Sequence, residues 1–366
     1  MGVTGHACPW DVVGDPSFAS RAAGLGVSTV ALASAYHSTR AATPLHPGHQ
    51  LVEARYAALY RPVRPEVWSS RRLRPVAPDW MPAASFDTAA AALRSAGLRV
   101  SAWVVLTHNT RLGVECPDVA VVNCFGERYP YALCPSWPEV REYAASLARE
   151  AAEGADEVSL EACGQLGLAH LSHHEKTDGA WTPAATRWLS VCCCPACRTG
   201  WTSRGLDATW VVSTLRDAVR AEAAGSAGEV PFAATLLETR HAATDLLRAE
   251  VLAELDVPVT LHAHPDPWAT GASPGLTPTA AGSVAALVVP AWPTAPETAD
   301  LIVRAARTGR PVDAYVTVLP PAEPAELLDH ARRLTAAGAT GVSLYHLGLA
   351  SGRCQPLLRE IANFWA

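Results

Sequence analysis

Three closely spaced cysteines, Cys192, Cys194 and Cys197, form a C-x-C-x-x-C pattern in the second half of the chain. A tight turn can aim the sulfur atoms of such a pattern at one ion, and a structural Zn²⁺ takes four ligands of this kind. Spacing alone leaves several cysteines as the fourth ligand: Cys8, Cys116, Cys124, Cys134 and Cys163. The alternative is that the cysteines are small buried hydrophobic residues, but such residues have no reason to cluster. The pattern therefore favours a structural zinc site.

A second group of residues follows the short apolar runs that we expect to be strands. Its members are His37, His108, His262, His264, Trp268, Trp292, Tyr345 and His346. Alternate residues of a strand face the same side, so His262 and His264 could share one ligand or one metal ion. Tryptophan rings suit the apolar faces of sugars, although their alternative role is core packing. Each histidine alone is better explained as a hydrogen-bonded polar residue, but the set indicates a polar binding site.

The composition argues against several classes of function. The 366 residues include 29 basic and 35 acidic side chains, so the net charge is 29 − 35 = −6. This charge argues against a sequence-independent nucleic-acid binder and against a polybasic membrane anchor. Lys176 is the only lysine, which nearly excludes Schiff-base and P-loop chemistry. We see no signal peptide and no membrane span, and we expect a bacterial, cytoplasmic protein whose cysteines are reduced.

Eight short apolar runs alternate with helical patterns along most of the chain. The runs do not alternate polar and apolar residues, which is typical of parallel strands buried on both faces. They are Val27–Ala33, Arg99–Leu106, Glu157–Glu161, Pro231–Leu237, Val259–Leu261, Ala285–Val289, Asp313–Leu319 and Gly341–Tyr345. This rhythm predicts a (β/α)8 TIM barrel that forms a single domain over residues 1–366. Long loops follow the early strands, and barrel enzymes build their sites from loops at that end.

Within this pattern, the stretch Tyr131–Tyr143 (YALCPSWPEVREY) resembles the Y-C-P-N-S-P-x-Y-R-E stretch of glycoside hydrolase family 42 β-galactosidases. The later run Cys192–Arg198 (CCCPACR) resembles the C-x-C-x-x-C-Arg motif of the same family. The resemblance implies that Cys134 joins Cys192, Cys194 and Cys197 in a structural zinc site. It also implies that Glu161 is the acid/base residue at a strand end. The same outline resembles uncharacterised glycosyl-hydrolase-like barrel families, and it covers about a fifth of the chain.

The chain departs from that family in its other expected residues. Leu160 replaces the asparagine that usually precedes the glutamate. Glu161 ends our third strand, whereas the family has its glutamate on the fourth, so we expect a hidden strand at 66–70. No acid ends the seventh strand, because Asp313 stands at its beginning. The second carboxylate that glycoside hydrolysis needs is then Glu238 or Asp266, with Glu175 on a long loop as a further candidate.

Three functions are consistent with these residues. The first is a glycoside-hydrolase-like enzyme that acts on a sugar or glycoside, with Glu161 as the acid and a structural Zn²⁺. The second is a metal-dependent hydrolase or isomerase that uses the histidine cluster. The third is a barrel that binds carbohydrate without turnover, which the missing late acid supports. In each, the partner is a small molecule or carbohydrate, with no nucleic acid and no membrane.

Overall fold

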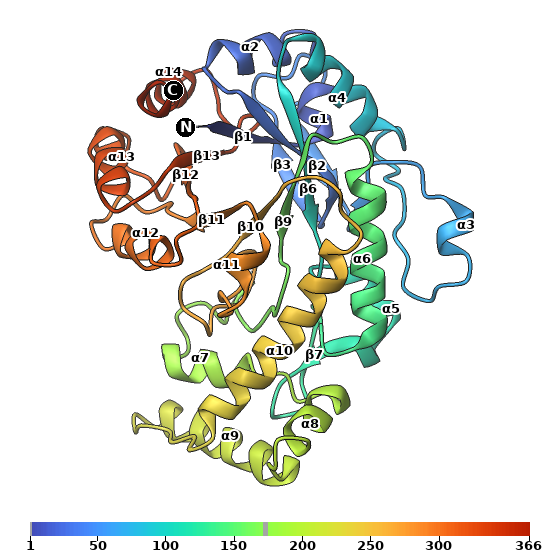
Figure 1. Ribbon diagram of the computed structural model, residues 1–366, viewed down its shortest axis with the longest axis vertical. Coiled ribbons are helices and arrows are strands. Elements are labelled where there is room, and N and C mark those ends of the chain that lie inside the picture. The colour runs from blue at the N-terminus through green and yellow to red at the C-terminus, as the bar shows by residue number, and fades with distance from the viewer. Residues whose placement is uncertain (1, 171–174) are drawn as a thin grey trace.

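A closed barrel of eight parallel strands forms the centre of the computed structural model, which describes residues 2–170 and 175–366 (Figure 1). The strands are β1 (Val3–Ala7), β2 (Thr29–Tyr36), β6 (Arg99–Val105), β9 (Glu157–Glu161), β10 (Val259–His262), β11 (Ala286–Pro290), β12 (Val312–Thr317) and β13 (Gly341–Tyr345). Each strand pairs in parallel with its neighbours, and β1 closes the ring by pairing with both β2 and β13. The prediction of a (β/α)8 TIM barrel is confirmed.

One predicted strand is wrong and one real strand was missed. The run at 231–237 belongs to the long helix α10 (Ala233–Leu252). A short apolar run cannot be told from part of a buried helix by periodicity alone. The missed strand is β1, where Gly5 and His6 interrupt the apolar pattern. The hidden strand expected at 66–70 is also wrong, because α3 (Pro65–Trp68) lies there. With β1 counted, Glu161 ends the fourth barrel strand.

Helices pack around the outside of the barrel, as the alternation predicts. They are α2 (Phe18–Gly24), α4 (Ser85–Ser95), α6 (Pro138–Ala152), α10, α12 (Thr298–Ala306), α13 (Leu327–Ala336) and α14 (Gln355–Trp365). Gly97 and Gly154, just beyond α4 and α6, have φ angles of +80° and +66°, which a residue with a Cβ rarely adopts. The glycine stop therefore turns the chain from these helices into the next strand. Every helix among the described residues is too short or too polar to cross a membrane.

Long insertions follow the early strands, also as predicted. After β2 come the hairpin β3 (Thr39–Ala42) and β4 (Leu51–Ala54), then β5 (Ala58–Leu59) and α3. After β6 come α5 (Thr110–Glu115), a 3₁₀ turn at Pro117–Val119, β7 (Ala120–Val122) and β8 (Arg128–Leu133). After β9 come α7 (Pro183–Leu189), α8 (Pro195–Thr202) and α9 (Ala208–Ala223). Figure 1 shows α7, α8 and α9 with one end of α10 as a lobe beyond the barrel. Short elements α1 (Pro9–Val12), α11 (Ala280–Ser283) and a 3₁₀ turn at Pro324–Glu326 complete the chain.

The barrel interior changes from small hydroxyl side chains to large rings along the strands. Near the strand beginnings, a cavity of about 350 Å³ is lined by residues that include Thr4, Ser101, Ser159, Thr260 and Ser343. Two residues further along the same strands stand His6, Trp103, Glu161, His262 and Tyr345. Because alternate residues of a strand face the same side, these five share the interior with the hydroxyl layer. The strand ends therefore bring the acid, the imidazoles and the aromatic rings together at the barrel mouth.

Candidate active site

Glu161 lies at the barrel mouth in a setting that favours its protonated form. It is the last residue of β9, pairs in register with Val105 of β6 and is 5% exposed. The indole N–H of Trp103 donates a hydrogen bond of 2.9 Å to its Oε2. Burial raises the pKa of Glu161 to about 7, against the opposing effect of the Trp103 hydrogen bond. A carboxyl group with this pKa can deliver a proton at neutral pH.

Aromatic side chains from three other strands surround this carboxyl group. Tyr36 ends β2, Tyr315 lies on β12 and Tyr345 ends β13. Burial raises the pKa of each phenol, and the charge of Glu161 raises it further. The ring of Trp292 stacks on Tyr345 with centroids 4.7 Å apart. Trp292 and Tyr345 are both half-buried, so these two predicted residues lie at the rim of the mouth.

Buried histidines complete the interior of the mouth. His262 Nε2 lies 3.0 Å from the Ser159 hydroxyl, and its ring centroid is 5.7 Å from that of His6. Burial lowers the pKa of His262 to about 3 and that of His346 to about 3, so both rings are neutral at neutral pH. His264 does not join them, because β10 ends at His262 and the alternation stops there. The Nδ1 of His264 instead accepts a hydrogen bond from the backbone N–H of Asp266.

Cys8, Asp11 and His346 form a third group at the mouth. The sequence predicted His346 as a binding residue and Cys8 only as a possible zinc ligand, and it missed Asp11. Cys8 Sγ lies 3.6 Å from His346 Nε2, and Asp11 Oδ2 lies 3.8 Å from His346 Nδ1. All three side chains are buried, and burial raises the pKa of Asp11 to about 7. Asp11 was missed because β1, the strand that places it at the mouth, was missed. The sequence signal that could have identified Asp11 is its place three residues after Cys8, because an acid at this position caps the start of a helix, here α1.

The predicted residues His37 and His108 form a separate row of imidazoles beside the mouth. Their rings stack with centroids 4.4 Å apart, and His108 Nε2 lies 2.7 Å from His170 Nε2. His170 Nδ1 lies 3.2 Å from a carboxylate oxygen of Glu175. His170 and Glu175 line a cavity of about 320 Å³. The loop histidines at 173 and 174 lie outside the described residues.

The two predicted partners of Glu161 lie in different surroundings. Glu238 is an exposed residue of α10, so the reason for choosing it, a strand end, is wrong. Asp266 is half-buried on the loop after β10, where its Oδ1 accepts a hydrogen bond from the backbone N–H of Trp268. Trp268 lies beneath the guanidinium of Arg240, which is 5.2 Å from the ring centroid. The structure therefore does not group Glu238 with the mouth residues and places Asp266 in a loop with basic neighbours.

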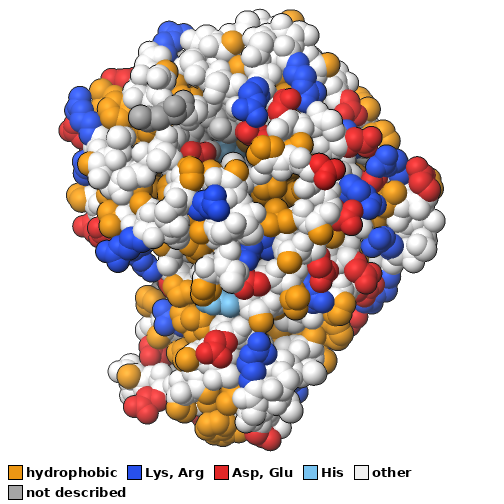
Figure 2. Space-filling view, viewed as in Figure 1, with side chains coloured by type: hydrophobic (Ala, Val, Ile, Leu, Met, Phe, Trp, Pro, Cys, Tyr) orange, Lys and Arg blue, Asp and Glu red, His pale blue; other side chains and the backbone are white. Residues whose placement is uncertain are grey.

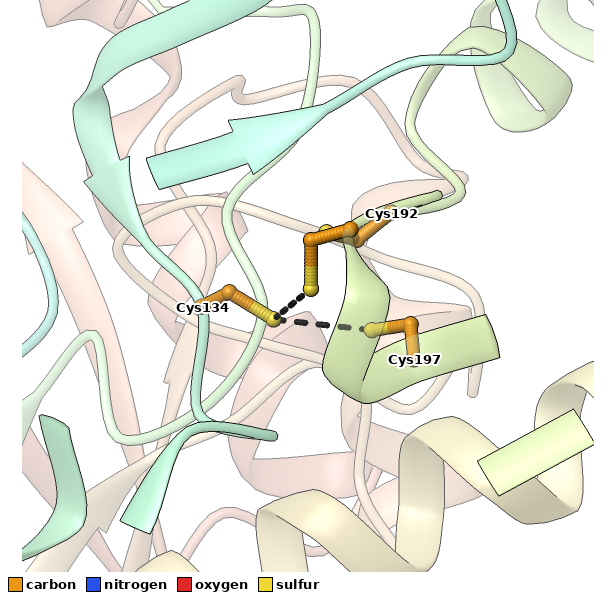
Figure 3. A group of neighbouring side chains, drawn as sticks. Cys134, Cys192 and Cys197 are labelled. Carbon is orange, nitrogen blue, oxygen red and sulfur yellow. Dashed lines mark hydrogen bonds between the residues drawn. The ribbon is translucent and has the colours of Figure 1, made fainter. Parts of the chain in front are cut away.

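The four predicted zinc ligands do come together, away from the acid. Cys134 precedes α6, whereas Cys192, Cys194 and Cys197 lie just before and within α8, and all four sulfur atoms are within 4.8 Å of one another. Figure 3 shows the sulfur atoms of Cys134 and Cys197 facing each other. Cys134 Sγ is 3.5 Å from Cys197 Sγ and 3.8 Å from Cys194 Sγ. Hydrogen bonding with Cys134, Cys192 and Cys197 holds the pKa of the Cys194 thiol well below its usual value. The Sγ of Cys193, which lies between two of these cysteines, donates instead to the carbonyl oxygen of Val191 at 3.5 Å.

A zinc ion fits this group of sulfur atoms. Zn–S bonds of ~2.3 Å in a tetrahedron place neighbouring sulfur atoms ~3.8 Å apart. The Sγ of Cys134 lies 3.5 Å from that of Cys197 and 3.8 Å from that of Cys194, which is close to that edge length. None of the ten cysteines, all of which lie among the described residues, forms a disulfide, so the four thiols are free to ligate. The arrangement could hold one metal ion and leave no position open for chemistry.

Figure 2 shows acidic and basic side chains interspersed over the visible face.

The chain matches no protein-family model and no curated protein sequence. It is similar in structure to the β-amylase catalytic domain of Paenibacillus polymyxa, with a TM-score of 0.61 and 12% identity over 98% of this chain and 97% of that one.

Two further similar structures are longer than this chain. The α-L-fucosidase isoenzyme 2 of Paenibacillus thiaminolyticus has a TM-score of 0.57 and 13% identity over 99% of this chain and 49% of that one. The β-galactosidase of Marinomonas ef1 has a TM-score of 0.52 and 12% identity over 99% and 59%. This chain therefore spans about half of the first enzyme and about three fifths of the second. At such identities the similarity establishes the fold, which is the (β/α)8 barrel that these glycoside hydrolases share.

Proposed function

We propose that the protein is a glycoside-hydrolase-like enzyme that acts on a sugar or glycoside, with Glu161 as the proton donor. The observation that carries this proposal is the buried carboxyl group at the end of the fourth barrel strand, with a pKa of about 7. Release of the leaving-group oxygen needs a carboxyl group that is protonated at the pH of the reaction. The resemblance to glycoside hydrolase family 42 supports the role, because that family has its acid/base glutamate on the fourth strand.

The aromatic rim supports a carbohydrate as the substrate. Trp292 and Tyr345 stack at the edge of the mouth, and both keep part of their surface exposed. Aromatic faces of this kind pack against the apolar C–H faces of sugar rings. His262 and His346 are neutral and buried next to the acid, so they can exchange hydrogen bonds with hydroxyl groups. His37, His108, His264 and Trp268 remain proposed substrate contacts from the surrounding loops.

The second carboxylate of the reaction is a separate proposal. Asp266 keeps that role among the residues chosen from the sequence, since Glu238 is exposed on α10. Asp11 shares neighbours with Glu161, because both carboxylates act on the thiol of Cys8 and on the phenol of Tyr345. However, Asp11 packs with a thiol and an imidazole, which is more typical of a metal ligand than of a free carboxylate.

We also propose that Cys134, Cys192, Cys194 and Cys197 bind one structural Zn²⁺. The support is the burial of all four thiols, their mutual separations of at most 4.8 Å, and the match of two of these separations, 3.5 and 3.8 Å, to the edge of a tetrahedron. Such an ion would join the chain before α6 to the start of α8, and so tie the lobe of α7–α9 to the barrel. Its contribution is to folding, because a closed four-sulfur site offers no position for substrate.

The role of Glu161 is tested with aryl glycosides that differ in their leaving groups. After a panel of sugars identifies a substrate, the Glu161→Gln variant is compared with the unmodified protein. We expect turnover of glycosides with poor leaving groups to fall by roughly 10²–10⁴-fold, because the departing oxygen is no longer protonated. Activated leaving groups need no proton, so their turnover should fall much less.

The exposed α6 residue Glu142 provides the matched control, since Glu142→Gln makes the same substitution on the protein surface. An equal loss for both kinds of leaving group would reject Glu161 as the proton donor. Binding of a sugar without turnover of any glycoside would reject the enzyme and leave the barrel as a carbohydrate-binding protein.

A further inference from the structure

The group formed by Cys8, Asp11 and His346 has the composition and compactness of a metal site. One ligand atom from each residue, a thiol sulfur, a carboxylate oxygen and an imidazole nitrogen, lies within 4.8 Å of the other two. The side chains are 2%, 3% and 4% exposed. They reach this place from opposite ends of the chain, because β1 and β13 pair side by side in the barrel.

Asp11 has an oxygen that the protein leaves without a partner. Its Oδ2 accepts a 2.7 Å hydrogen bond from the backbone N–H of Cys8, but its Oδ1 is buried with no hydrogen-bond partner. Among the described residues, no arginine or lysine pairs with this carboxylate. Gly348 packs directly against it, since a Cβ at Gly348 would overlap the carboxylate. A buried carboxylate that lacks both a cation and a full set of donors is costly unless it takes up a proton or a ligand completes it.

We propose that Cys8, Asp11 and His346 bind a second divalent metal ion, of the class of Zn²⁺, at the barrel mouth. The separation of Cys8 Sγ and His346 Nε2 is 3.6 Å. Zn–S and Zn–N bonds of ~2.3 and ~2.05 Å at the tetrahedral angle place these two atoms ~3.6 Å apart. The mixed sulfur, nitrogen and oxygen set favours Zn²⁺, Co²⁺ or Fe²⁺ over the oxygen-seeking Mg²⁺ and Ca²⁺.

Binding requires a defined rearrangement of protons. The backbone N–H of Gly348 donates to His346 Nδ1 at 3.1 Å, so the proton of this neutral ring is on Nε2 in the metal-free protein. A metal ion at Nε2 takes the place of that proton, and the ring proton moves to Nδ1, which loses its hydrogen bond from Gly348. Asp11 Oδ2 is 3.8 Å from Nδ1 and would have to approach by several tenths of an ångström to accept this proton. The Cys8 thiol loses its proton when it ligates.

This site differs in kind from the group of four cysteines. Three protein ligands leave the fourth position of a tetrahedron open, as in catalytic zinc sites, whereas four cysteines close it. Cys8 is close enough to Glu161 for the carboxylate charge to raise the pKa of its thiol. Cys8 and His346 directly follow β1 and β13, and Glu161 ends β9, so the open position would lie at the same end of the barrel as Glu161. The site stands apart from the glycosidase proposal, because metal binding can be measured without any substrate.

The test counts metal ions in the full chain. Purified protein is stripped with a chelator, loaded with Zn²⁺, freed of excess metal and analysed for zinc by mass spectrometry. We expect about two ions per chain, one in each kind of site. The variants Cys8→Ala and His346→Gln should each retain about one. Cys163→Ala is the matched control, because Cys163 is as buried but belongs to neither group, and it should retain about two.

Cobalt spectra separate the two sites even if a variant folds poorly. Co²⁺ at the four-cysteine site and Co²⁺ at the mixed site give different visible bands, because thiolate number sets band position and intensity. In the unmodified protein the spectrum should contain both components, and Cys8→Ala should lose only the mixed one. Crystals soaked in Zn²⁺ should show anomalous density between Cys8 and His346. One ion per chain in the unmodified protein, or an unchanged mixed component in Cys8→Ala, would overturn the proposal.

Discussion

The high pKa of Glu161 makes the stability of the protein depend on pH in a way that one substitution should remove. The folded protein keeps the proton on this carboxyl group up to a pH of about 7, whereas the reference value for an exposed glutamate is 4.5. Between these values the unfolded chain binds fewer protons than the folded protein. The free energy of unfolding therefore falls as the pH rises through this window and is constant above it.

The size of the effect follows from the two pKa values. A separation of one pKa unit corresponds to ~1.4 kcal/mol, so the full loss is about 3 kcal/mol, of which about 2.5 kcal/mol falls between pH 5 and pH 8. Glutamine cannot ionise, so the Glu161→Gln variant lacks this loss. The free energy of unfolding of the variant minus that of the unmodified protein should therefore be about 2.5 kcal/mol more positive at pH 8 than at pH 5.

Urea denaturation followed by tryptophan fluorescence gives the free energy of unfolding of both proteins at each pH. Asp11, whose pKa is also about 7, titrates in both proteins, so its contribution cancels in the comparison. The exposed control Glu142→Gln measures the effect on stability of replacing a surface glutamate by glutamine. A stability difference between the unmodified protein and Glu161→Gln that stays the same at both pH values, within ~0.5 kcal/mol, would refute the raised pKa.

Two further predictions concern the proposed zinc site and the acid. Cys197→Ser should remove the zinc of the four-cysteine group and lower the melting temperature, whereas Cys193→Ser should do neither, because the Cys193 sulfur faces away. Zinc analysis measures the metal content and calorimetry the melting temperature. Equal effects of the two substitutions would contradict the ligand assignment. Trp103→Phe should raise the pKa of Glu161, since it removes the N–H that stabilises the ionised form, so the alkaline limb of the pH–rate profile should move to higher pH. A limb that stays in place or moves to lower pH would contradict the role of Trp103.

The features that the sequence predicted correctly are local. The C-x-C-x-x-C spacing brings three sulfur atoms to one turn, whatever the rest of the chain does. Apolar runs and glycine-terminated helices report burial and backbone geometry over a few residues, so seven of the eight predicted strands are strands of the barrel. The failure at 231–237 has the same origin, because a short apolar run carries no information on whether it packs as a strand or as the start of a helix. That residues 1–366 form a single domain, and that the protein is cytoplasmic, stay predictions.

The sequence alone therefore determined the alternation of strands and helices, the cluster of cysteines and the position of Glu161 at a strand end. The tertiary structure decided which side chains surround that acid. Cys8 and His346 are 338 residues apart and meet only because the first and last strands pair to close the barrel. The pKa of about 7 likewise comes from burial among Trp103 and the tyrosines of distant strands. Burial and closure depend on the whole ring of strands, so the local capping pattern could mark Asp11 as the start of a helix but could not place it beside His346.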